Sequence, residues 1–356
     1  MKRASYLVLL AAGLIATGCG DSDPAKPATP QTDRLAWIGT LTGAPQLNGD
    51  IVIDLTQTGS AIQGETVFAS DIHVWFVGSA SSDSIFLTPD PSYPAPAGAF
   101  SLRARILPNG DLSGSMAFTA AGISADLSCR ALAWRHIEDD VTRVVPYSVI
   151  ALAYDESSMW LSTTGDDFVR MSPGGTIVDT VVIYHDPLPA HWTTSAFTYD
   201  GALLWGMYPI TIMGPGGLTN VADLLAFTAS GRAPDSVRVT HRPNGLAHDG
   251  ARVWSLRADP AALLELDVMG GVIDSLHLAI PDAIGLAFDG THFWTAGWFL
   301  QRLYEVDPNG QVVGICDLGD SPSGRLPVGL AAEGSHVWFA AGLPGGPTTL
   351  HRMTFR

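Results

Sequence analysis

The feature that most constrains the fold is a tryptophan that recurs at nearly equal intervals in the second half of the chain. The five copies are Trp160, Trp205, Trp254, Trp294 and Trp338, at spacings of 45, 49, 40 and 44 residues. Five positions before each tryptophan stands an acid: Asp155, Asp200, Asp249, Asp289 and Glu333. A glycine follows the acid in four of the five copies. A period of 40 to 50 residues indicates a repeat architecture.

Each copy is built from short apolar stretches separated by turn residues. The segments Ala283–Gly297 and Arg302–Val313 together predict three strands and the start of a fourth. An Asp-Gly pair between alternating apolar stretches is a strong signal for a two-residue hairpin. Four strands per period predict the blade of a β-propeller. Five copies predict five blades, and a divergent sixth blade stays open.

The ends of the repeat region predict how the ring closes. The fifth copy ends at Arg356 after its third strand. The missing fourth strand is supplied before the first copy, where Asp140 lies 15 residues before Asp155. In a complete copy, Asp274 likewise lies 15 residues before Asp289. We therefore expect the strand at Val141–Val145 to complete the last blade as a clasp and to hide the sheet edges.

A different all-β unit is expected at residues 34–135, before the propeller at 136–356. Residues 50–57 and 100–107 alternate between apolar and polar types, and glycine-containing turns separate about eight strand candidates. Eight sequential antiparallel strands can close into a small barrel. Trp37 and the glycines near it resemble the pattern of avidin-like and lipocalin-like barrels. A small ligand inside the barrel stays an alternative, although an interior filled by side chains is favoured.

The first residues predict export and anchoring. Lys2 and Arg3 precede an apolar run of signal-peptide length, so residues 1–18 are expected to be a signal peptide. The small residues before Cys19 resemble the lipobox of bacterial lipoproteins, which implies cleavage before Cys19 and lipidation of its thiol. Residues 19–33 are rich in proline and polar types and are expected to form a disordered tether. The expected location is the outer membrane or cell surface, with a periplasm-facing position also possible.

The charge of the chain limits the classes of binding partner, and its cysteines bear on whether a disulfide is expected. The chain has 35 acidic and 19 basic residues, a net charge of −16, so nucleic-acid binding is not expected. Cys129 and Cys316 are expected to be small buried hydrophobes rather than a disulfide. Neither a metal site nor a cofactor is predicted, and the protein is expected to be a monomer.

The repeated Gly-Leu-Ala-x-Asp-Gly-x-x-x-Trp stretch resembles the blades of NHL-type and Tyr-Val-Thr-Asn propellers. It is also similar to the five-bladed plant-type glutaminyl cyclases, in which a glutamate precedes one such Gly-Leu pair. The matching positions here are Asn244, Ile284 and Val328. The resemblance therefore implies the fold and does not carry over the acid of the cyclase site.

The loops on the two faces of the predicted ring differ in length, and the face with long, irregular loops is the expected binding face. Its richest loop contains His185, Asp186, His191 and Trp192. Paired carboxylates occur at Asp166 and Asp167, and Trp298 could stack on a ligand. The charged groups that could clamp an anionic group are Arg257 with Asp259, and Arg242 and Arg325.

The sequence favours a non-catalytic, membrane-anchored lipoprotein whose propeller binds a protein or glycan partner. Linear signatures of common enzymes are missing, including the nucleophile elbow, the zinc-protease helix and the phosphate-binding loop. A propeller assembles a site from several blades, so a propeller enzyme, either a cyclase-like acyl transferase or a lyase, stays the alternative. Ligand binding by the N-terminal barrel is the third possibility.

Overall fold

The computed structural model describes most of the chain beyond its N-terminal segment. The described residues are 32–68, 72–93, 100–135, 137–164, 167–182, 196–214, 217–228, 231–258, 260–298, 300–318, 326–342 and 346–355. They form strands and one short 3-10 helix, Thr119–Ala121, and contain no α-helix. No helix in this part of the chain has the length and apolar character needed to cross a membrane. The all-β class predicted from the sequence is confirmed.

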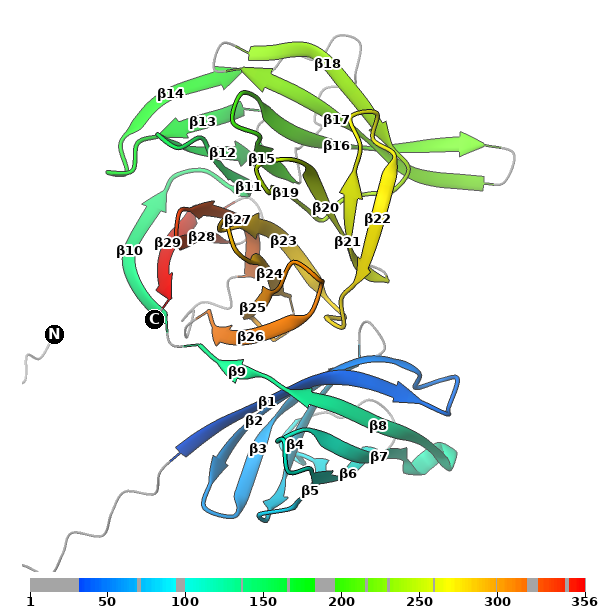
Figure 1. Cartoon of the computed structure of the whole chain (residues 1–356). Coiled ribbons are helices and arrows are strands. Elements are labelled where there is room, and N and C mark those ends of the chain that lie inside the picture. The colour runs from blue at the N-terminus through cyan, green and yellow to red at the C-terminus, as the bar shows by residue number, and fades with distance from the viewer. Residues whose placement is uncertain are drawn as a thin grey trace, which may run out of the picture. The chain divides into compact units, whose positions relative to one another are not determined.

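The first eight strands form a closed antiparallel barrel in sequential order (Figure 1). The strands are β1 (Thr32–Thr42), β2 (Gly49–Thr58), β3 (Ala61–Phe68), β4 (Ile72–Ala80), β5 (Ser84–Pro89), β6 (Phe100–Ile106), β7 (Leu112–Phe118) and β8 (Ile123–Ala131). β1 pairs with both β2 and β8, which closes the ring. The predicted barrel is therefore confirmed, and no sheet edge of it is left open.

Large apolar side chains fill the interior of the barrel. Ile51, Ile53 and Leu55 alternate along β2 with residues that point outward, and all three are buried. Trp37 lies in the same cluster and donates its indole N–H to the Gly110 carbonyl, at 2.9 Å. This filled interior agrees with the favoured sequence interpretation, and it gives no support to a ligand inside the barrel.

The rest of the described chain forms five blades of a propeller (Figure 1). Blade 1 contains β11 (Val149–Tyr154), β12 (Met159–Thr163), β13 (Asp167–Met171) and β14 (Ile177–Val182). Blade 2 contains β15 (Phe197–Tyr199), β16 (Leu204–Gly214), β17 (Gly217–Thr228) and β18 (Gly231–Val239). Blade 3 contains β19 (Gly245–His248), β20 (Val253–Ala258), β21 (Ala261–Leu266) and β22 (Val272–His277). Blade 4 contains β23 (Ala283–Phe288), β24 (Phe293–Gly297), β25 (Arg302–Val306) and β26 (Val312–Asp317).

Blade 5 is assembled from both ends of the propeller sequence. Its strands β27 (Leu326–Glu333), β28 (His336–Gly342) and β29 (Thr348–Phe355) come from the C-terminus. The outer strand is β10 (Ile137–Val145), which pairs antiparallel with β29. The clasp predicted at Val141–Val145 is thus confirmed.

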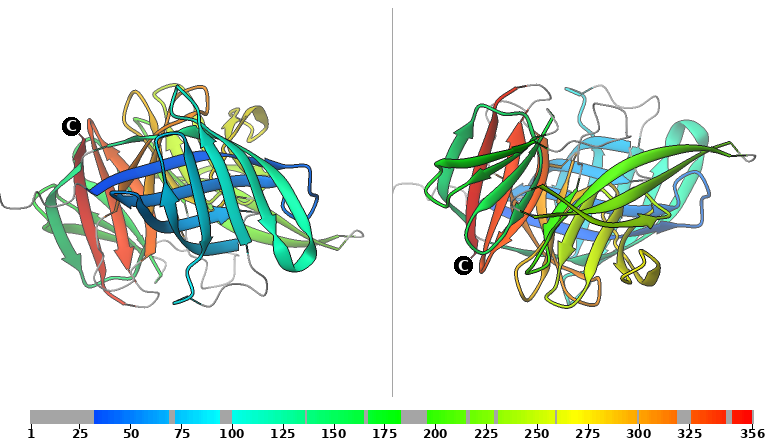
Figure 2. Two further views of the ribbon diagram at one scale, coloured as in Figure 1. Left: turned by 90° about the horizontal axis from the view of Figure 1, so that it is seen from below. Right: turned by 90° about the horizontal axis from the view of Figure 1, so that it is seen from above.

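Blade 4 has an additional strand, and blade 2 has two unusually long ones. The short strand β9 (Ala133–Trp134) pairs in parallel with β26, so blade 4 has a fifth strand at its outer edge. In blade 2, β16 and β17 have 11 and 12 residues and extend as a hairpin beyond the other strands (Figure 2). The first strands of the five blades contact one another around the axis of the ring.

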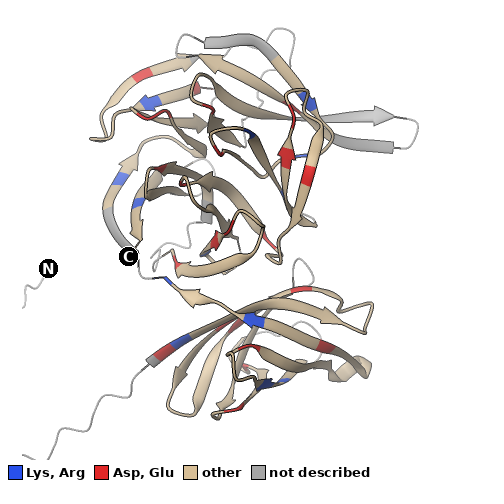
Figure 3. Cartoon of the chain, viewed as in Figure 1, with Lys and Arg blue, Asp and Glu red and all other residues tan. Residues whose placement is uncertain are grey.

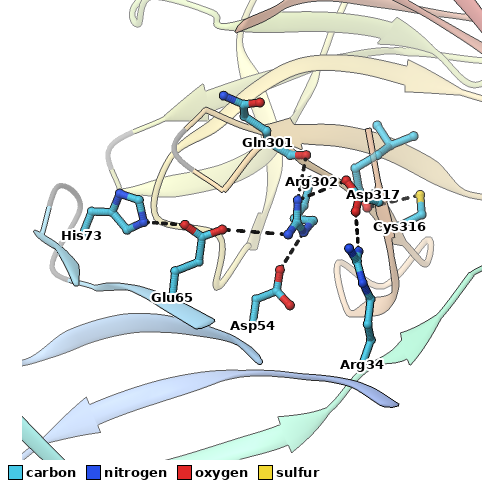
Figure 4. A network of polar contacts seen from close by, with 9 residues as sticks. Arg34, Asp54, Glu65, His73, Gln301, Arg302, Cys316 and Asp317 are labelled. Atoms are coloured by element: carbon cyan, nitrogen blue, oxygen red, sulfur yellow. Dashed lines mark hydrogen bonds and ion pairs between the residues drawn. The ribbon is translucent and has the colours of Figure 1, made fainter. Parts of the chain in front are cut away.

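The barrel packs against blades 3 and 4. Ala36, Ile38, Val52 and Val67 share one hydrophobic cluster with residues of these blades. Beside this cluster, Arg302 of β25 donates to Asp54 of β2 at 2.6 Å and lies 3.8 Å from Glu65 (Figure 4). Residues Thr32–Arg356 form one compact unit, and the boundary predicted at residue 135 therefore stays a prediction.

Two further charged residues, Asp317 and Arg34, extend the contact between Arg302 and the barrel. Arg302 also bonds to Asp317 at 3.2 Å, and Arg34 pairs with the other oxygen of Asp317 (Figure 4). The ring of Trp134 lies within 5.0 Å of the Arg34 guanidinium carbon and 5.9 Å of that of Arg302. Burial opposes the ionised form and raises the pKa of Asp54, although the charge of Arg302 lowers it. These groups were not predicted as an interface.

The two cysteines of this unit are buried and unbonded, as expected. Burial raises the pKa of the Cys129 thiol to about 12 and that of Cys316 further still. Both thiols are therefore protonated and unreactive at neutral pH.

Candidate functional site

The recurrent acid and tryptophan form the same contact in every blade. In each case a carboxylate oxygen accepts the indole N–H of the tryptophan five residues later. The five pairs and their distances are Asp155 with Trp160, 2.6 Å; Asp200 with Trp205, 2.6 Å; Asp249 with Trp254, 2.7 Å; Asp289 with Trp294, 2.7 Å; and Glu333 with Trp338, 2.7 Å. The acids of the repeat are thus part of the scaffold.

The second oxygen of the aspartates holds the following turn. In blade 4, Asp289 accepts the backbone N–H groups of Thr291 and His292 at 2.7 and 2.8 Å. Burial would raise the pKa of Asp155, Asp200 and Asp249, but these hydrogen bonds outweigh it and lower the pKa of all three. The carboxylates therefore stay ionised at neutral pH and add negative charge to this face of the ring.

The residue after the acid occupies a left-handed backbone conformation. Glycine fills this position in four blades, with φ values of 95°, 95°, 94° and 57° at Gly201, Gly250, Gly290 and Gly334. Blade 1 places Glu156 there, at a φ of 68°. A side chain at such a position costs about 1 kcal/mol or more, and strain of this kind concentrates at functional sites. Glu156 is exposed and lies at the edge of the cavity described next.

A cavity of about 920 Å³ opens at the ring axis, on the face that carries these acid-containing turns. We call it the funnel. Its floor is made by one apolar side chain from the first strand of each blade: Leu152, Phe197, Leu246, Leu286 and Leu330. The space behind this ring is only about 10 Å³, so the described inner strands nearly close the axis.

Small residues allow the inner strands to come this close. A Cβ on Gly245 would lie 2.5 Å from the backbone nitrogen of Leu286, and one on Gly329 would lie 2.9 Å from the Cα of Ala151. The Gly-Leu pairs of the repeat are therefore explained by packing: the glycine admits the neighbouring strand and the leucine shuts the axis.

The wall of the funnel is aromatic and its rim is acidic. The position before the acid provides Tyr154, Tyr199, His248 and Phe288. The rim carries Glu156, Asp200, Asp249, Asp289 and Glu333, and no Lys or Arg belongs to the described lining. Of these rim acids, Glu333 alone has an ion pair among the described residues, with Arg352 at 3.6 Å. Figure 3 shows the acidic positions at the blade turns.

The tyrosines of the wall are held by their own turns. Tyr199 donates its hydroxyl to the Gly201 carbonyl at 2.8 Å, and Tyr154 donates to the Glu156 carbonyl at 3.2 Å. Burial, followed by nearby carboxylates, raises the pKa of both phenols. Their rings are thus fixed and neutral, which suits them for contact with a ligand rather than for proton transfer.

Most of the site residues predicted from the sequence lie outside the described residues: Cys19, Asp166, His185, Asp186, His191, Trp192, Asp259 and Arg325. Four are described and none of them lines the funnel: Asp167, Arg242, Arg257 and Trp298. Asp167 begins β13, Arg242 is exposed, and Trp298 donates its backbone N–H to the Asp282 carbonyl at 3.2 Å. The funnel lies on the face of short turns, whereas the sequence favoured the face of long loops.

Arg257 lies near a polar pair, half-buried His241 and buried Ser255, that the sequence did not reveal. The Nε2 atom of His241 is 2.7 Å from the hydroxyl of Ser255. Burial, with a smaller effect of the Arg257 charge, lowers the pKa of His241 to about 4, so the imidazole is neutral at pH 7. This arrangement of base and hydroxyl occurs in acyl-transfer enzymes. Ser255 is fully buried, however, and a substrate cannot reach it.

The described part of the chain contains no candidate metal site. No group of three or more histidine, cysteine, aspartate or glutamate side chains there could hold a metal ion. The five funnel carboxylates come from five different blades, and four of them, Asp200, Asp249, Asp289 and Glu333, are bonded to the indole N–H of their tryptophan.

No protein-family model and no curated protein matches the chain. Among solved structures, similarity is found to glutaminyl cyclase of Myxococcus xanthus, at 14% identity and a TM-score of 0.48, over 63% of this chain and 99% of that one. Regucalcin of Agrobacterium tumefaciens, a calcium-binding protein, matches at 13% identity and a TM-score of 0.38, over 72% and 88%. PQQ-bound aldose sugar dehydrogenase of Streptomyces coelicolor matches at 10% identity and a TM-score of 0.39, over 63% and 99%.

The propeller resemblance expected from the repeat is confirmed by the five blades of the structure itself. The TM-scores of these similarities are all below 0.5, so neither fold, substrate nor reaction is inferred from them.

Proposed function

We propose that this protein is a non-catalytic binding protein whose funnel takes a positively charged segment of a protein partner. One observation carries the proposal: blade 1 accepts a strained backbone to place the Glu156 carboxylate where the other blades have glycine. The funnel lining supports the choice of ligand, since it combines five carboxylates and four ring side chains with no Lys or Arg among the described residues. Ring faces and carboxylates together suit lysine and arginine side chains.

An enzymatic function has weaker support. The carboxylates of the repeat are occupied by scaffold hydrogen bonds, and the His241–Ser255 pair is closed to substrate. The proposal therefore keeps the binding function expected from the sequence but moves it to the opposite face of the propeller.

We also propose that Cys19 is lipidated and anchors the protein outside the cytoplasm, on the lipobox-like residues before it. Intact mass and membrane fractionation of the wild type and of Cys19→Ala test the anchor. A wild-type protein that is recovered without lipid overturns it.

The binding proposal is tested with fluorescein-labelled peptides on the full-length protein. We expect a Gly-Ser peptide with several lysines to bind, its acidic counterpart not to bind, and the affinity to fall as salt rises. Glu156→Gln should weaken binding about fivefold, since a charge-assisted contact contributes roughly 1 kcal/mol at an exposed site. Asp179→Asn is the matched control, because Asp179 is an exposed acid of the outer strand β14.

Equal binding of the basic and acidic peptides would overturn the proposal. So would binding of a neutral glycan by the wild type that Glu156→Gln leaves unchanged.

A further inference from the structure

A second cavity, of about 430 Å³, lies between blades 2 and 3 and borders the funnel. We call it the groove. Asp200 and His248 line both the funnel and the groove, so the two cavities share a wall. The remaining groove lining is mainly apolar and includes Trp205, Leu224, Val237, Leu266, Val268 and Ile273.

The groove is bounded by a turn of blade 3 that reaches onto blade 2. A Cβ on Gly270, which has a φ of 80°, would lie 2.4 Å from the Cγ1 atom of Val237 and 2.6 Å from the Arg238 carbonyl oxygen. The β21–β22 turn is thus fixed against β18. Its apolar side chains stay at the surface, since Val268 is 89% exposed and Met269 is 78% exposed.

The groove differs from the funnel in carrying an arginine. This residue, Arg252, pairs with Glu265, and the described lining also contains the acids Asp200 and Asp267. Contiguous exposed apolar surface beside a polar cavity marks interaction sites. The groove therefore offers an apolar surface directly next to a negatively charged one.

His248 lies at the junction of the two cavities. Its Nδ1 atom accepts the backbone N–H of Gly250 at 3.3 Å, which leaves the Nε2 atom as a hydrogen-bond donor. A positive charge on the ring would favour the ionised forms of Asp200 and Asp249. A peptide backbone that passes from the funnel to the groove would meet a hydrogen-bond donor at this point.

We infer that the funnel and the groove form one composite site for a peptide segment with a basic residue and a nearby apolar residue. The basic side chain enters the funnel, and the apolar side chain lies in the groove against Val268 and Ile273. This inference rests on the proposed function, since it assigns the second half of the same ligand. It adds a sequence preference that the acidic funnel alone would not produce.

The test compares two sets of labelled peptides on the full-length protein. One is the lysine-containing Gly-Ser peptide, and the other set replaces one serine by leucine at each position in turn. We expect one or two leucine positions to raise the affinity about tenfold, the scale of burying one such side chain. Leucine at the other positions should have no effect.

The variant Val268→Ser/Ile273→Ser should remove this leucine preference and leave the affinity for the leucine-free peptide unchanged. Both side chains are exposed, Ile273 at 54%, so the variant is expected to fold. The matched control is Ile177→Ser/Val178→Ser on the outer strand β14 of blade 1, whose side chains are 40% and 57% exposed. This control should keep the preference.

The outcomes separate the two proposals. A leucine preference that is absent, or that survives in Val268→Ser/Ile273→Ser, overturns the groove while the lysine-dependent binding still stands. If the basic and acidic peptides bind equally, or Glu156→Gln has no effect, the funnel proposal fails, whatever the leucine positions show.

Discussion

The barrel and the propeller are both closed rings of antiparallel strands, yet the centre of one is filled and that of the other is hollow at one end. In the barrel, hydrogen bonds run around the ring, so eight strands fix a diameter that inward side chains such as Ile53 can fill. In the propeller, hydrogen bonds run outward from the axis within each blade. The width of the propeller at its axis is therefore set by the size of the side chains on the first strand of each of the five blades.

This difference explains where each ring can hold a ligand. Gly245 and Gly329 let the inner strands close the axis at one level, and beyond them the strands diverge toward the turns. A repeated sequence thus produces a funnel with a sealed floor, whereas the alternation of the barrel strands leaves a packed core.

The largest effect is expected from removing the strand that closes the propeller. Deleting residues 348–355 removes β29 and leaves β10 without its partner. We expect the cooperative thermal transition of the propeller to disappear, because blade 5 would expose a sheet edge and the ring would open. Near-ultraviolet circular dichroism measures it, and a synthetic peptide of residues 346–355 should restore part of the signal. An unchanged melt would mean that the clasp does not close the ring.

The next effect distinguishes a repeated core tryptophan from one on the barrel surface. Trp160 is 1% exposed, so Trp160→Ala should cost about 3–5 kcal/mol of unfolding free energy, measured by urea denaturation. Trp160→Phe should cost about 1–2 kcal/mol, since mainly the bond to Asp155 is lost. Trp75 on the barrel is 37% exposed, and Trp75→Ala should cost less than about 1 kcal/mol. Equal costs for the two alanine variants would contradict the repeated core.

Lowering the pH should change the stability contributions of Asp200 in the propeller and Asp54 in the barrel in opposite directions. The pKa of Asp200 is lowered in the folded state, so its contribution to stability is present above the ordinary pKa of 3.8 and is lost as pH falls through the folded value. The pKa of Asp54, which is buried where the barrel meets the propeller, is raised, so its contribution grows as pH falls through that higher value. Urea unfolding between neutral pH and pH 3 should therefore show a shallower loss for Asp200→Asn and a steeper loss for Asp54→Asn. The same slope in both variants would show that these shifts do not control acid stability.

The smallest effect concerns the strained turn of blade 1. Glu156→Gly should raise the unfolding free energy by about 1 kcal/mol, since glycine adopts a positive φ without a steric cost. It should also weaken binding of the lysine peptide as Glu156→Gln does. Gly201→Ala is the matched change in blade 2 and should lower stability by a similar amount. A destabilising effect of Glu156→Gly would mean that the turn is not strained.

The architecture can be predicted from the sequence because the same pattern of strands and turns occurs in five copies. The Trp spacing, the Asp-Gly turns and the clasp at Val141–Val145 all correspond to observed elements. These signals depend on local hydrogen bonds and on alternation, which neighbouring residues determine.

The site is less predictable because it depends on what the blades bring together. Tyr154, Tyr199 and His248 occupy one repeat position just before the acid, and their convergence appears only in the closed ring. That variable aromatic position, and Glu156 in place of glycine, were the available signals. The contact between Arg302 and Asp54 joins residues 248 positions apart and has no local signature.

The pairing of β10 with β29 also governs the order in which a chain of this kind becomes complete. The barrel strands are synthesised first, but blade 5 cannot form until β29 has been synthesised. A chain that is cut short near its end keeps nearly all of its core and still presents an unpaired edge. Such an edge opens locally and exposes the chain to proteolysis, so the pairing of β10 with β29 distinguishes a closed propeller from a truncated one.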